Sequence, residues 1–272
     1  MWFTLILFLS IVFIIFIVLK KPIQATQALN WTAIHKKSPI IALDNTKVSI
    51  QNIKDFSYSP DGKIQTHRYF DQCFDINQIK AVWYGVAHFS GFGIAHAFLS
   101  FEFEDGQFLV TSIEARRKSK EKYSPLKGLF NHYNKIIVFG TESDIIGLRS
   151  HYLNHQVYLY PLEMDALESQ NLFDGVLQDA IKLQNQPAFY NTFLDNCFTG
   201  IAKFNSNWNI LRNLFDYRVL LPGFSDALAQ KMGLVDQTLP IKALRLKAKV
   251  NPNHSQPRDD DFSKQIRKNY HS

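Results

Sequence analysis

Cysteine is scarce in this sequence: only Cys73 and Cys197 occur in 272 residues. Two cysteines so far apart make no zinc-binding motif, and the Asp and His residues do not cluster at the spacings of metal ligands. A glycine-rich phosphate-binding loop is absent as well. We therefore expect no metal ion and no cofactor. A single disulfide between the two cysteines stays open as an alternative if the domain is exported.

Nucleic-acid-binding signatures are absent too, although the chain is basic, with a formal net charge of +6. The positive charges are spread along the chain, and no zinc-finger or RRM pattern is present. We therefore expect no nucleic acid as a partner. A mildly basic protein suits an anionic phospholipid surface better. The sequence also has no internal repeat, and it does not determine the oligomeric state.

Residues 2–19, WFTLILFLSIVFIIFIVL, form an apolar run without charge. This length is at the short end of what crosses a bilayer as a helix. No basic region precedes the run and QATQA is a poor cleavage site, so we favour a retained transmembrane helix over a cleaved signal peptide. Lys20 and Lys21 follow the run, and the positive-inside rule would then keep the remaining chain in the cytoplasm.

Hydrophobic patterns after this run predict one α+β domain with an antiparallel sheet at its centre. Apolar runs bounded by turn residues predict strands at 47–59, 79–89, 94–104, 107–115, 135–140 and 157–162. A 3.6-residue period predicts helices over 164–181 and 201–211, and Ser143 can cap a short helix over 144–153. We divide the chain into a transmembrane anchor (1–20), a linker (21–43), a catalytic domain (44–235) and a basic, largely disordered tail (236–272).

The predicted strand 94–104 has an apolar face and a more polar face, because successive side chains point to opposite sides. His96 belongs to the more polar face. If EDG forms a three-residue loop with Gly106 in the left-handed conformation, the register sets His96 opposite Glu114. Glu114 would then hold the imidazole in one tautomer. A two-residue turn would place Ala115 there instead, and a purely structural histidine is the alternative reading of His96.

The second cysteine lies in YNTFLDNCFTG, residues 190–200. Asp195 or Asn196 is a favourable N-cap, which places Cys197 in the first turn of a helix. The free N–H groups and the helix dipole would lower the pKa of the thiol there and stabilise an oxyanion. His96 could then act as the base for a nucleophilic Cys197. The alternative is a buried structural cysteine beside Phe198.

Several sequence blocks follow one another in a characteristic order: GIAHAFLSFEFEDGQFLVTSIEARRKSKEKYSPLKGLF, IIVFGTESDIIGLR, VYLYPL and FYNTFLDNC. Together with VSIQNIKDFSYS they resemble the N-terminal extracytoplasmic domain of Lnb-type proteins, the lipoprotein intramolecular transacylases, over about residues 47–212. The resemblance implies a permuted papain-like (NlpC/P60) fold with a histidine strand before a cysteine at a helix start. The family motif has two threonines after the cysteine, where this chain has Phe198 and Thr199.

The resemblance places His96 and Cys197 on the catalytic positions of a membrane-anchored cysteine acyltransferase. It implies that the cysteine takes an acyl chain from a diacylglyceryl lipoprotein as a thioester and passes it to the α-amino group of the same lipoprotein. Membrane phospholipid and diacylglyceryl lipoprotein are the implied partners. The implied location is the inner membrane, single-pass, with the catalytic domain on the periplasmic side, in spite of the two lysines after the apolar run.

Other residues are candidates for substrate binding. Arg116 and Arg149 could bind a phosphate headgroup or a carboxylate, although single arginines are usually solvated or paired with acids. Tyr190 and Asn196 flank the cysteine and could shape the site, with a helix cap as the alternative role of Asn196. Two functional alternatives also stay open: a thiol hydrolase that cuts cell-wall peptide or lipid ester, and a non-enzymatic binding module of the same fold.

Overall fold

The computed structural model describes residues 6–13, 30–204, 213 and 216–271. Within these ranges one sheet of nine strands has the order β1-β2-β9-β8-β7-β6-β10, with β11 paired to β9 and β5 paired to β2. The strands are β1 (Ile40–Asp44), β2 (Lys47–Lys54), β5 (Tyr69–Asp75), β6 (Ile79–His88), β7 (Ala95–Phe103), β8 (Phe108–Arg116), β9 (Tyr133–Gly140), β10 (Gln156–Pro161) and β11 (Phe189–Tyr190). The pairings are antiparallel apart from a short parallel contact between β2 and β9. A separate hairpin joins β3 (Ser57–Tyr58) and β4 (Ile64–Thr66).

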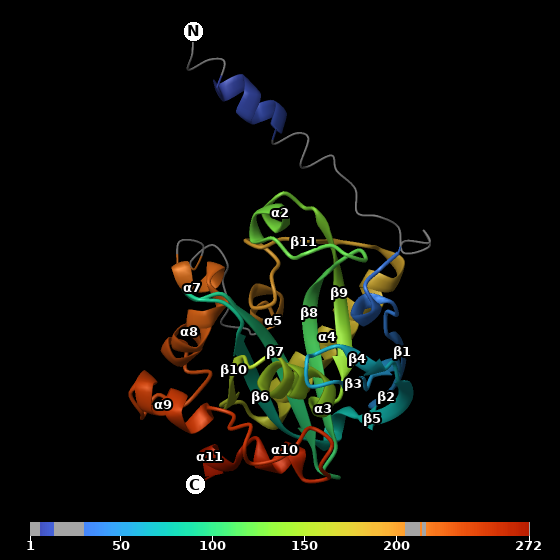
Figure 1. Ribbon diagram of the computed structural model, residues 1–272, viewed down its shortest axis with the longest axis vertical. Coiled ribbons are helices and arrows are strands. Elements are labelled where there is room, and N and C mark those ends of the chain that lie inside the picture. The colour runs from blue at the N-terminus through green and yellow to red at the C-terminus, as the bar shows by residue number, and fades with distance from the viewer. Residues whose placement is uncertain (1–5, 14–29, 205–212, 214–215, 272) are drawn as a thin grey trace.

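Helices and single turns connect and cover the strands (Figure 1). The longest of them in the described body is α4 (Ala166–Asn185), which begins with a capping box formed by Asp165 and Glu168. The others are η1 (Ala33–His35), η2 (Ile76–Gln78), α2 (Pro125–Leu129), α3 (Glu142–Gly147), η3 (Leu148–Tyr152), α5 (Thr199–Ala202), α7 (Tyr217–Leu220), η4 (Pro222–Phe224), α8 (Ser225–Lys231), α9 (Ile241–Ala248), α10 (Phe262–Gln265) and α11 (Lys268–His271).

The hairpin of β7 and β8 has the three-residue loop that the sequence suggests. Phe103 N–H donates to the Gln107 carbonyl at 2.9 Å, and Gly106 has φ +81°, the left-handed conformation that glycine tolerates best. Phe98 pairs with Ser112 in the same register. Of the two loop types that the sequence left open, the structure therefore has the three-residue one, and its register, continued past the last pair, sets His96 opposite Glu114.

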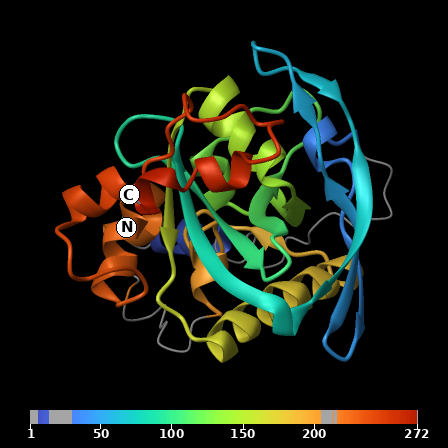
Figure 2. The same ribbon diagram turned by 90° about the horizontal axis from the view of Figure 1, so that it is seen from below.

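The two faces of the sheet are buried against different helices. On one face Phe101 of β7 packs against Phe173 of α4, with 4.6 Å between the ring centroids. On the other face Phe98 of β7 belongs to a cluster that includes Ile145 of α3 and Phe262 of α10. Figure 2 shows the sheet between α4 on one side and α3 with the C-terminal helices on the other. The alternation of side chains along β7 therefore builds both layers of the core.

The predicted fold class needs a correction at its N-terminal end. We predicted a transmembrane helix over residues 1–20, of which 1–5 and 14–20 lie outside the described residues. The described part of this stretch is a helix over 6–13. In the part of the chain that the structure describes, no helix is both long enough and apolar enough to cross a membrane. The transmembrane helix in the predicted fold class is therefore wrong, and the described fold is a mixed α/β domain with one large sheet.

The predicted linker, residues 21–43, is described from residue 30 onward and contributes to the sheet. Trp31 forms a β-bridge with Lys118, and every residue of β1 pairs with β2. His35 of η1 is buried, with 1% of its surface exposed. This stretch carries little hydrophobic periodicity, because its contacts are mainly backbone pairing and buried His35, with Ile41 as its one side chain in the main core.

The predicted disordered tail, residues 236–272, forms α9, α10 and α11 on the body of the domain. Leu244, Phe262 and Ile266 are each at most 3% exposed. The charge of this segment suggested solvation, but several of its cations pair with acids of the domain. Arg267 is the clearest case, since its Nη1 donates to Glu142 Oε2 at 2.9 Å where both side chains are almost fully buried.

The buried pair yields a test of how much this segment stabilises the domain. Replacing Arg267 with Met leaves the Glu142 carboxylate buried without its cation, which typically costs about 3–5 kcal/mol. We expect Arg267→Met to lower the free energy of urea unfolding by about that amount, and Arg267→Met/Glu142→Gln to recover part of the loss.

The matched control is Lys63→Met, which breaks the exposed ion pair between Lys63 and Asp61. We expect no measurable change for the control, since solvent screens exposed pairs. An Arg267→Met variant as stable as the wild type would show that the C-terminal segment is not held by this pair.

Candidate active site

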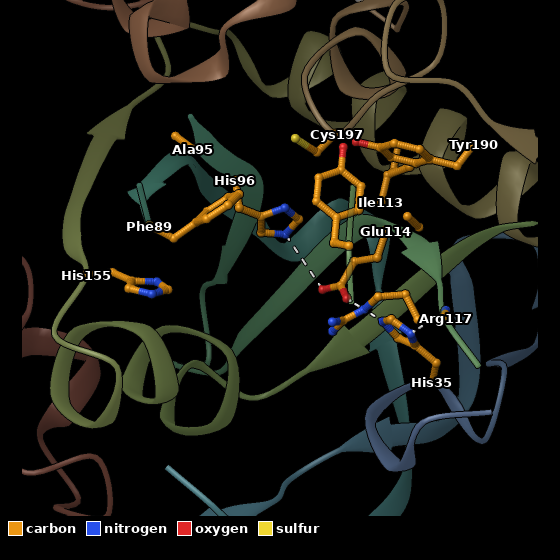
Figure 3. A pocket seen from close by; sticks show the side chains of 12 residues that line it. His35, Phe89, Ala95, His96, Ile113, Glu114, Arg117, His155, Tyr190 and Cys197 are labelled. Atoms are coloured by element: carbon orange, nitrogen blue, oxygen red, sulfur yellow. Dashed lines mark hydrogen bonds and ion pairs between the residues drawn. The ribbon is translucent and has the colours of Figure 1, made fainter. Parts of the chain in front are cut away.

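Cys197 and His96 line one pocket at the end of the sheet where α2 and β11 lie (Figures 1 and 3). The pocket has a volume of about 380 Å³. β7 supplies His96, β8 supplies Glu114, and the turn before α5 supplies Cys197. Its lining residues are His35, Phe89, Ala95, His96, Ile113, Glu114, Ala115, Arg117, Tyr123, His155, Tyr190 and Cys197. The structure therefore brings together the three residues that the sequence suggested as catalytic.

The position of Cys197 is set by Asn196, whose side chain caps the following turn. Asn196 Oδ1 accepts hydrogen bonds from the N–H groups of Phe198 at 2.8 Å and Thr199 at 2.9 Å. The Asn196 carbonyl accepts from Gly200 N–H at 2.9 Å. The regular helix α5 begins only at Thr199 and has four residues, so Cys197 lies in the turn that precedes it.

The Cys197 thiol is enclosed by the end of β7. Pairing between β7 and β8 stops at Phe98 and Ser112. Ala97 N–H, one residue beyond the last pair, donates to Cys197 Sγ at 3.4 Å. Cys197 is 3% exposed, and burial raises the pKa of its thiol to about 11, although the Ala97 N–H lowers it in part. The expected lowering of the thiol pKa is therefore outweighed by desolvation, and Cys197 is a neutral thiol.

A hydrogen-bonded chain fixes the tautomer of His96. Ser112 Oγ donates to Glu114 Oε1 at 2.9 Å, because an ionised carboxylate can only accept. Ser112 Oγ therefore accepts the second hydrogen bond, 2.6 Å long, from His96 Nε2–H. With its proton on Nε2, His96 keeps the lone pair of Nδ1 free. Figure 3 shows the His96 ring between Cys197 and Glu114, and its dashed line marks the 3.6 Å contact from His96 Nε2 to Glu114 Oε1.

Glu114 is held by two further groups. His35 Nδ1 accepts from the backbone N–H of Arg117 at 3.1 Å, so the proton of His35 is on Nε2, which donates to Glu114 Oε2 at 2.8 Å. Arg149 Nη2 donates to Glu114 Oε1 at 3.4 Å. Burial alone would raise the pKa of the Glu114 carboxyl, but the His35 hydrogen bond and the nearby positive charges hold it well below its usual range. Glu114 is therefore an anion.

His96 is neutral for an electrostatic reason. Burial, and after it the positive charge of Arg149, lowers the pKa of His96 to about 3, and the Glu114 carboxylate offsets only part of this. The pocket thus holds a neutral thiol and a neutral imidazole with a free Nδ1. Such a pair can pass a proton from sulfur to nitrogen when sulfur attacks a substrate, without a resting thiolate.

The four predicted substrate-binding residues have different places. Tyr190 lines the pocket, and Asn196 is the capping residue described above, with Nδ2 donating to the Val219 carbonyl at 3.1 Å. Arg149 contacts Glu114 and the Ile145 carbonyl. Arg116 lies outside the pocket, because its guanidinium donates to the carbonyls of residues 35 and 36 and stacks on Trp31.

Sequence reasoning missed several residues of the site. His35 lies in the predicted linker, where no pattern marks it. Arg117 lines the pocket and its neighbour Arg116 does not. Strand parity would have favoured Arg116, which shares the parity of Glu114, but Arg117 lies beyond the last residue of β8, where the alternation of the strand ends. Ser112 shares the parity of Glu114 on β8, so the hairpin register could also have found it. In the described residues, no cluster of His, Cys, Asp or Glu is arranged to hold a metal ion.

A known domain family matches most of this region. A family model described as the Lnb N-terminal periplasmic domain matches residues 65–223. The matched range contains His96, Ser112, Glu114 and Cys197, whereas His35 precedes it. No curated protein and no solved structure matches the chain.

The raised pKa of Cys197 predicts its reactivity. In a Cys73→Ser variant, which removes the exposed second thiol, the rate of alkylation by iodoacetamide should keep rising with pH up to about 11. The physical reason is that only the thiolate reacts and burial disfavours it. The Cys197→Ser variant, with Cys73 as its only thiol, serves as the exposed control. A Cys197 rate that levels off below about pH 8 would contradict the neutral thiol.

The lowered pKa of His96 predicts acid sensitivity of the fold. The unfolded chain binds a proton at His96 near pH 6.5, whereas the folded chain binds it only near pH 3. Between these values the unfolded state holds more protons, so the free energy of unfolding falls as the pH falls. At about pH 5 this one group removes about 2 kcal/mol relative to neutral pH.

Urea unfolding of His96→Gln at both pH values tests this. The variant should lose about 2 kcal/mol less than the wild type on acidification. The control His67→Gln changes an exposed histidine outside the pocket and should follow the wild type. Equal acid losses in His96→Gln and the wild type would refute the assignment.

Proposed function

The chain belongs to the Lnb family through its N-terminal periplasmic domain, and we propose that it is a cysteine acyltransferase of lipoprotein processing. Its described body is an extracytoplasmic domain of that family. In the proposed reaction Cys197 takes an acyl chain from the diacylglyceryl group of a lipoprotein, and the N-terminal amine of the same lipoprotein receives it. We further propose that the histidine strand and the cysteine turn correspond to a permuted papain-like (NlpC/P60) arrangement.

The observation that carries the proposal is the chain of hydrogen bonds from His96 through Ser112 to Glu114, in the pocket that Cys197 also lines. His96 has its proton on Nε2, bound to Ser112, and offers Nδ1 to the pocket that Cys197 lines. The hydrogen bond to Ser112 satisfies Nε2 alone, so Nδ1 keeps its lone pair available for the proton of the thiol. A neutral base beside a neutral thiol is suited to general-base attack on an ester.

The proposed reaction consists of two acyl transfers, first from the glycerol ester to Cys197 and then from Cys197 to the amine. Cys197 Sγ attacks the ester carbonyl and its proton moves to His96 Nδ1; the glycerol oxygen then leaves with that proton, and a thioester remains on sulfur. The uncharged α-amine next attacks the thioester and gives its proton to His96, which returns it to sulfur as the thiol leaves. The products are an N-acyl amide and a lysoglyceryl lipoprotein.

Tyr190 is proposed as a donor to the oxyanion formed in both steps. Its hydroxyl lines the pocket beside Cys197, and burial raises its pKa well above the usual value, so the hydroxyl keeps its proton. Arg149 is proposed to act through Glu114, and Arg117 is the cation that faces the pocket itself.

The acceptor of the acyl chain distinguishes the proposed acyltransferase from a thiol hydrolase and from a binding module. In a deletion strain without other lipoprotein N-acylation, mass spectrometry of lipoprotein N-termini should show N-acylated lyso-forms with the wild type. Cys197→Ser should abolish them, and His96→Gln should slow their formation by about 10²–10⁴-fold. Cys73→Ser is the matched control and should behave as the wild type, since Cys73 is exposed on β5.

Each rival has its own signature in the same experiment. Release of free fatty acid, or cleavage of cell-wall peptide, without N-acylation would indicate a thiol hydrolase. Lipoproteins that are identical with the wild type and with Cys197→Ser would refute the transfer, and a binding module would then fit best.

A further inference from the structure

Exposed apolar side chains surround the mouth of the Cys197 pocket. Most of the exposed large hydrophobic residues in the described part of the body lie on four segments: the loop between β6 and β7, α2 with the residue after it, the turn before α5, and α7. We name these side chains the rim: Phe89, Phe92, Leu126, Leu129, Phe130, Leu194, Tyr217 and Leu220. All four segments lie at the end of the molecule that carries the pocket (Figure 1).

The loop between β6 and β7 holds Phe92 outward. Phe92 is 87% exposed and has φ +55°, a conformation that is unfavourable for a bulky side chain. The next residue, Gly93, is clamped to η4, because its carbonyl accepts from Gly223 N–H at 2.8 Å. A Cβ on Gly223 would lie 2.7 Å from Gly93 Cα, so the two backbones touch. The fold therefore maintains a strained, solvent-exposed phenylalanine at the mouth of the pocket.

Lysines adjoin the apolar rim. Lys118, Lys120, Lys122 and Lys127 lie on α2 and on the loop before it, and all four are exposed. Within the described chain none of the four forms an ion pair with an acid through its side chain. The one acid of this loop, Glu121, is bound to His132 at 2.6 Å. The loop thus presents uncompensated positive charge beside Leu126 and Leu129.

An apolar groove leads from the rim to the thiol. A pocket of about 120 Å³ is lined by rim residues and by Cys197 itself. Its lining residues are Phe89, Ile94, Ala95, Tyr123, Pro125, Tyr190, Thr192, Asn196, Cys197, Leu220, Leu221 and Pro222. A hydrocarbon chain that enters between α2 and α7 would therefore reach Sγ along apolar side chains.

The helix over residues 6–13 lies at the same end. Its large side chains are exposed, and Phe13 packs edge-on against Phe130 of the rim with 5.3 Å between the ring centroids. This contact places the C-terminal end of the described helix at the rim, and Figure 1 shows the helix beyond α2 at that end of the molecule.

We propose that the rim docks on the surface of an anionic lipid bilayer, with the four lysines at the headgroups and the apolar side chains below them. The inference rests on the proposed function for the statement that the substrate is a lipid. It adds that the rim is the surface that brings the Cys197 pocket into contact with that lipid.

A lipid layer fits these observations better than a protein partner does. Protein interfaces are depleted in lysine relative to the rest of the surface, whereas interfacial lipid-binding segments combine lysine with Phe and Leu. The groove that ends at Cys197 also needs an occupant of hydrocarbon character.

The position of single side chains relative to the bilayer tests the docking. In the full chain with Cys73→Ser and Cys197→Ser, a fluorophore is attached at Phe92→Cys or Leu126→Cys, both on the rim. The matched controls are Leu246→Cys on α9 and Leu167→Cys on α4, which are 73% and 64% exposed. Vesicles contain phosphatidylglycerol and a brominated lipid that quenches only nearby probes.

Quenching at the two rim positions but not at the two controls is the expected result. Because quenching reports where a side chain lies, it separates rim docking from attachment through residues 6–13 alone. Replacing the four lysines with Gln should weaken binding to these vesicles by about fivefold per lysine at low salt.

Two results would overturn the inference. Rim probes quenched no more than the Leu246 probe would show that the rim does not face lipid, and a protein partner would then become the occupant. Equal quenching of the rim probes on pure phosphatidylcholine vesicles would show that docking does not require an anionic lipid surface.

The outcome is independent of acyl transfer, because the assay uses Cys197→Ser. N-acylated lipoprotein without rim quenching would refute the docking alone. Rim quenching without N-acylation would refute the proposed function alone.

Discussion

A buried anion that must be satisfied is the constraint on which the candidate site depends. Glu114 lies on β8 with 15% of its side-chain surface exposed, and an unpaired carboxylate that is largely buried would cost several kcal/mol. His35, Ser112 and Arg149 supply its donors from three different parts of the chain. Each donor is in turn committed to one protonation state. The negative charge of Glu114 therefore determines which atoms of His35, Ser112 and His96 carry a proton.

The same low-dielectric environment decides the state of the thiol. A short helix start would favour a thiolate, but the burial of Cys197 at the end of β7 disfavours any charge there. Arg149 acts in the same direction on His96, since it keeps the imidazole uncharged. The pair is thus arranged for proton transfer during attack rather than for a stable ion pair.

The two ends of the sheet serve different purposes. At one end α2, α7 and the loop between β6 and β7 surround the pocket with exposed apolar side chains and lysines (Figure 1). Near the other end the C-terminal helices cover the sheet and bury the pair of Arg267 and Glu142. The exposed apolar side chains therefore gather at the end of the molecule that carries the pocket.

Local pattern determined much of the fold. The strands β2, β6, β7, β8, β9 and β10 and the helix α4 could be predicted, because periodicity of 2 or 3.6 acts over a few residues. The register that sets His96 opposite Glu114 was one of two that the sequence left open, and the left-handed Gly106 of the structure decides between them. The tertiary structure alone decided that His35 completes the site, that residues 236–272 fold onto the body, and that the expected transmembrane helix is absent from the described residues. It also raised the pKa of Cys197 instead of lowering it. These outcomes depend on which distant groups share one buried volume, and desolvation and long-range pairing leave no periodic trace in a sequence.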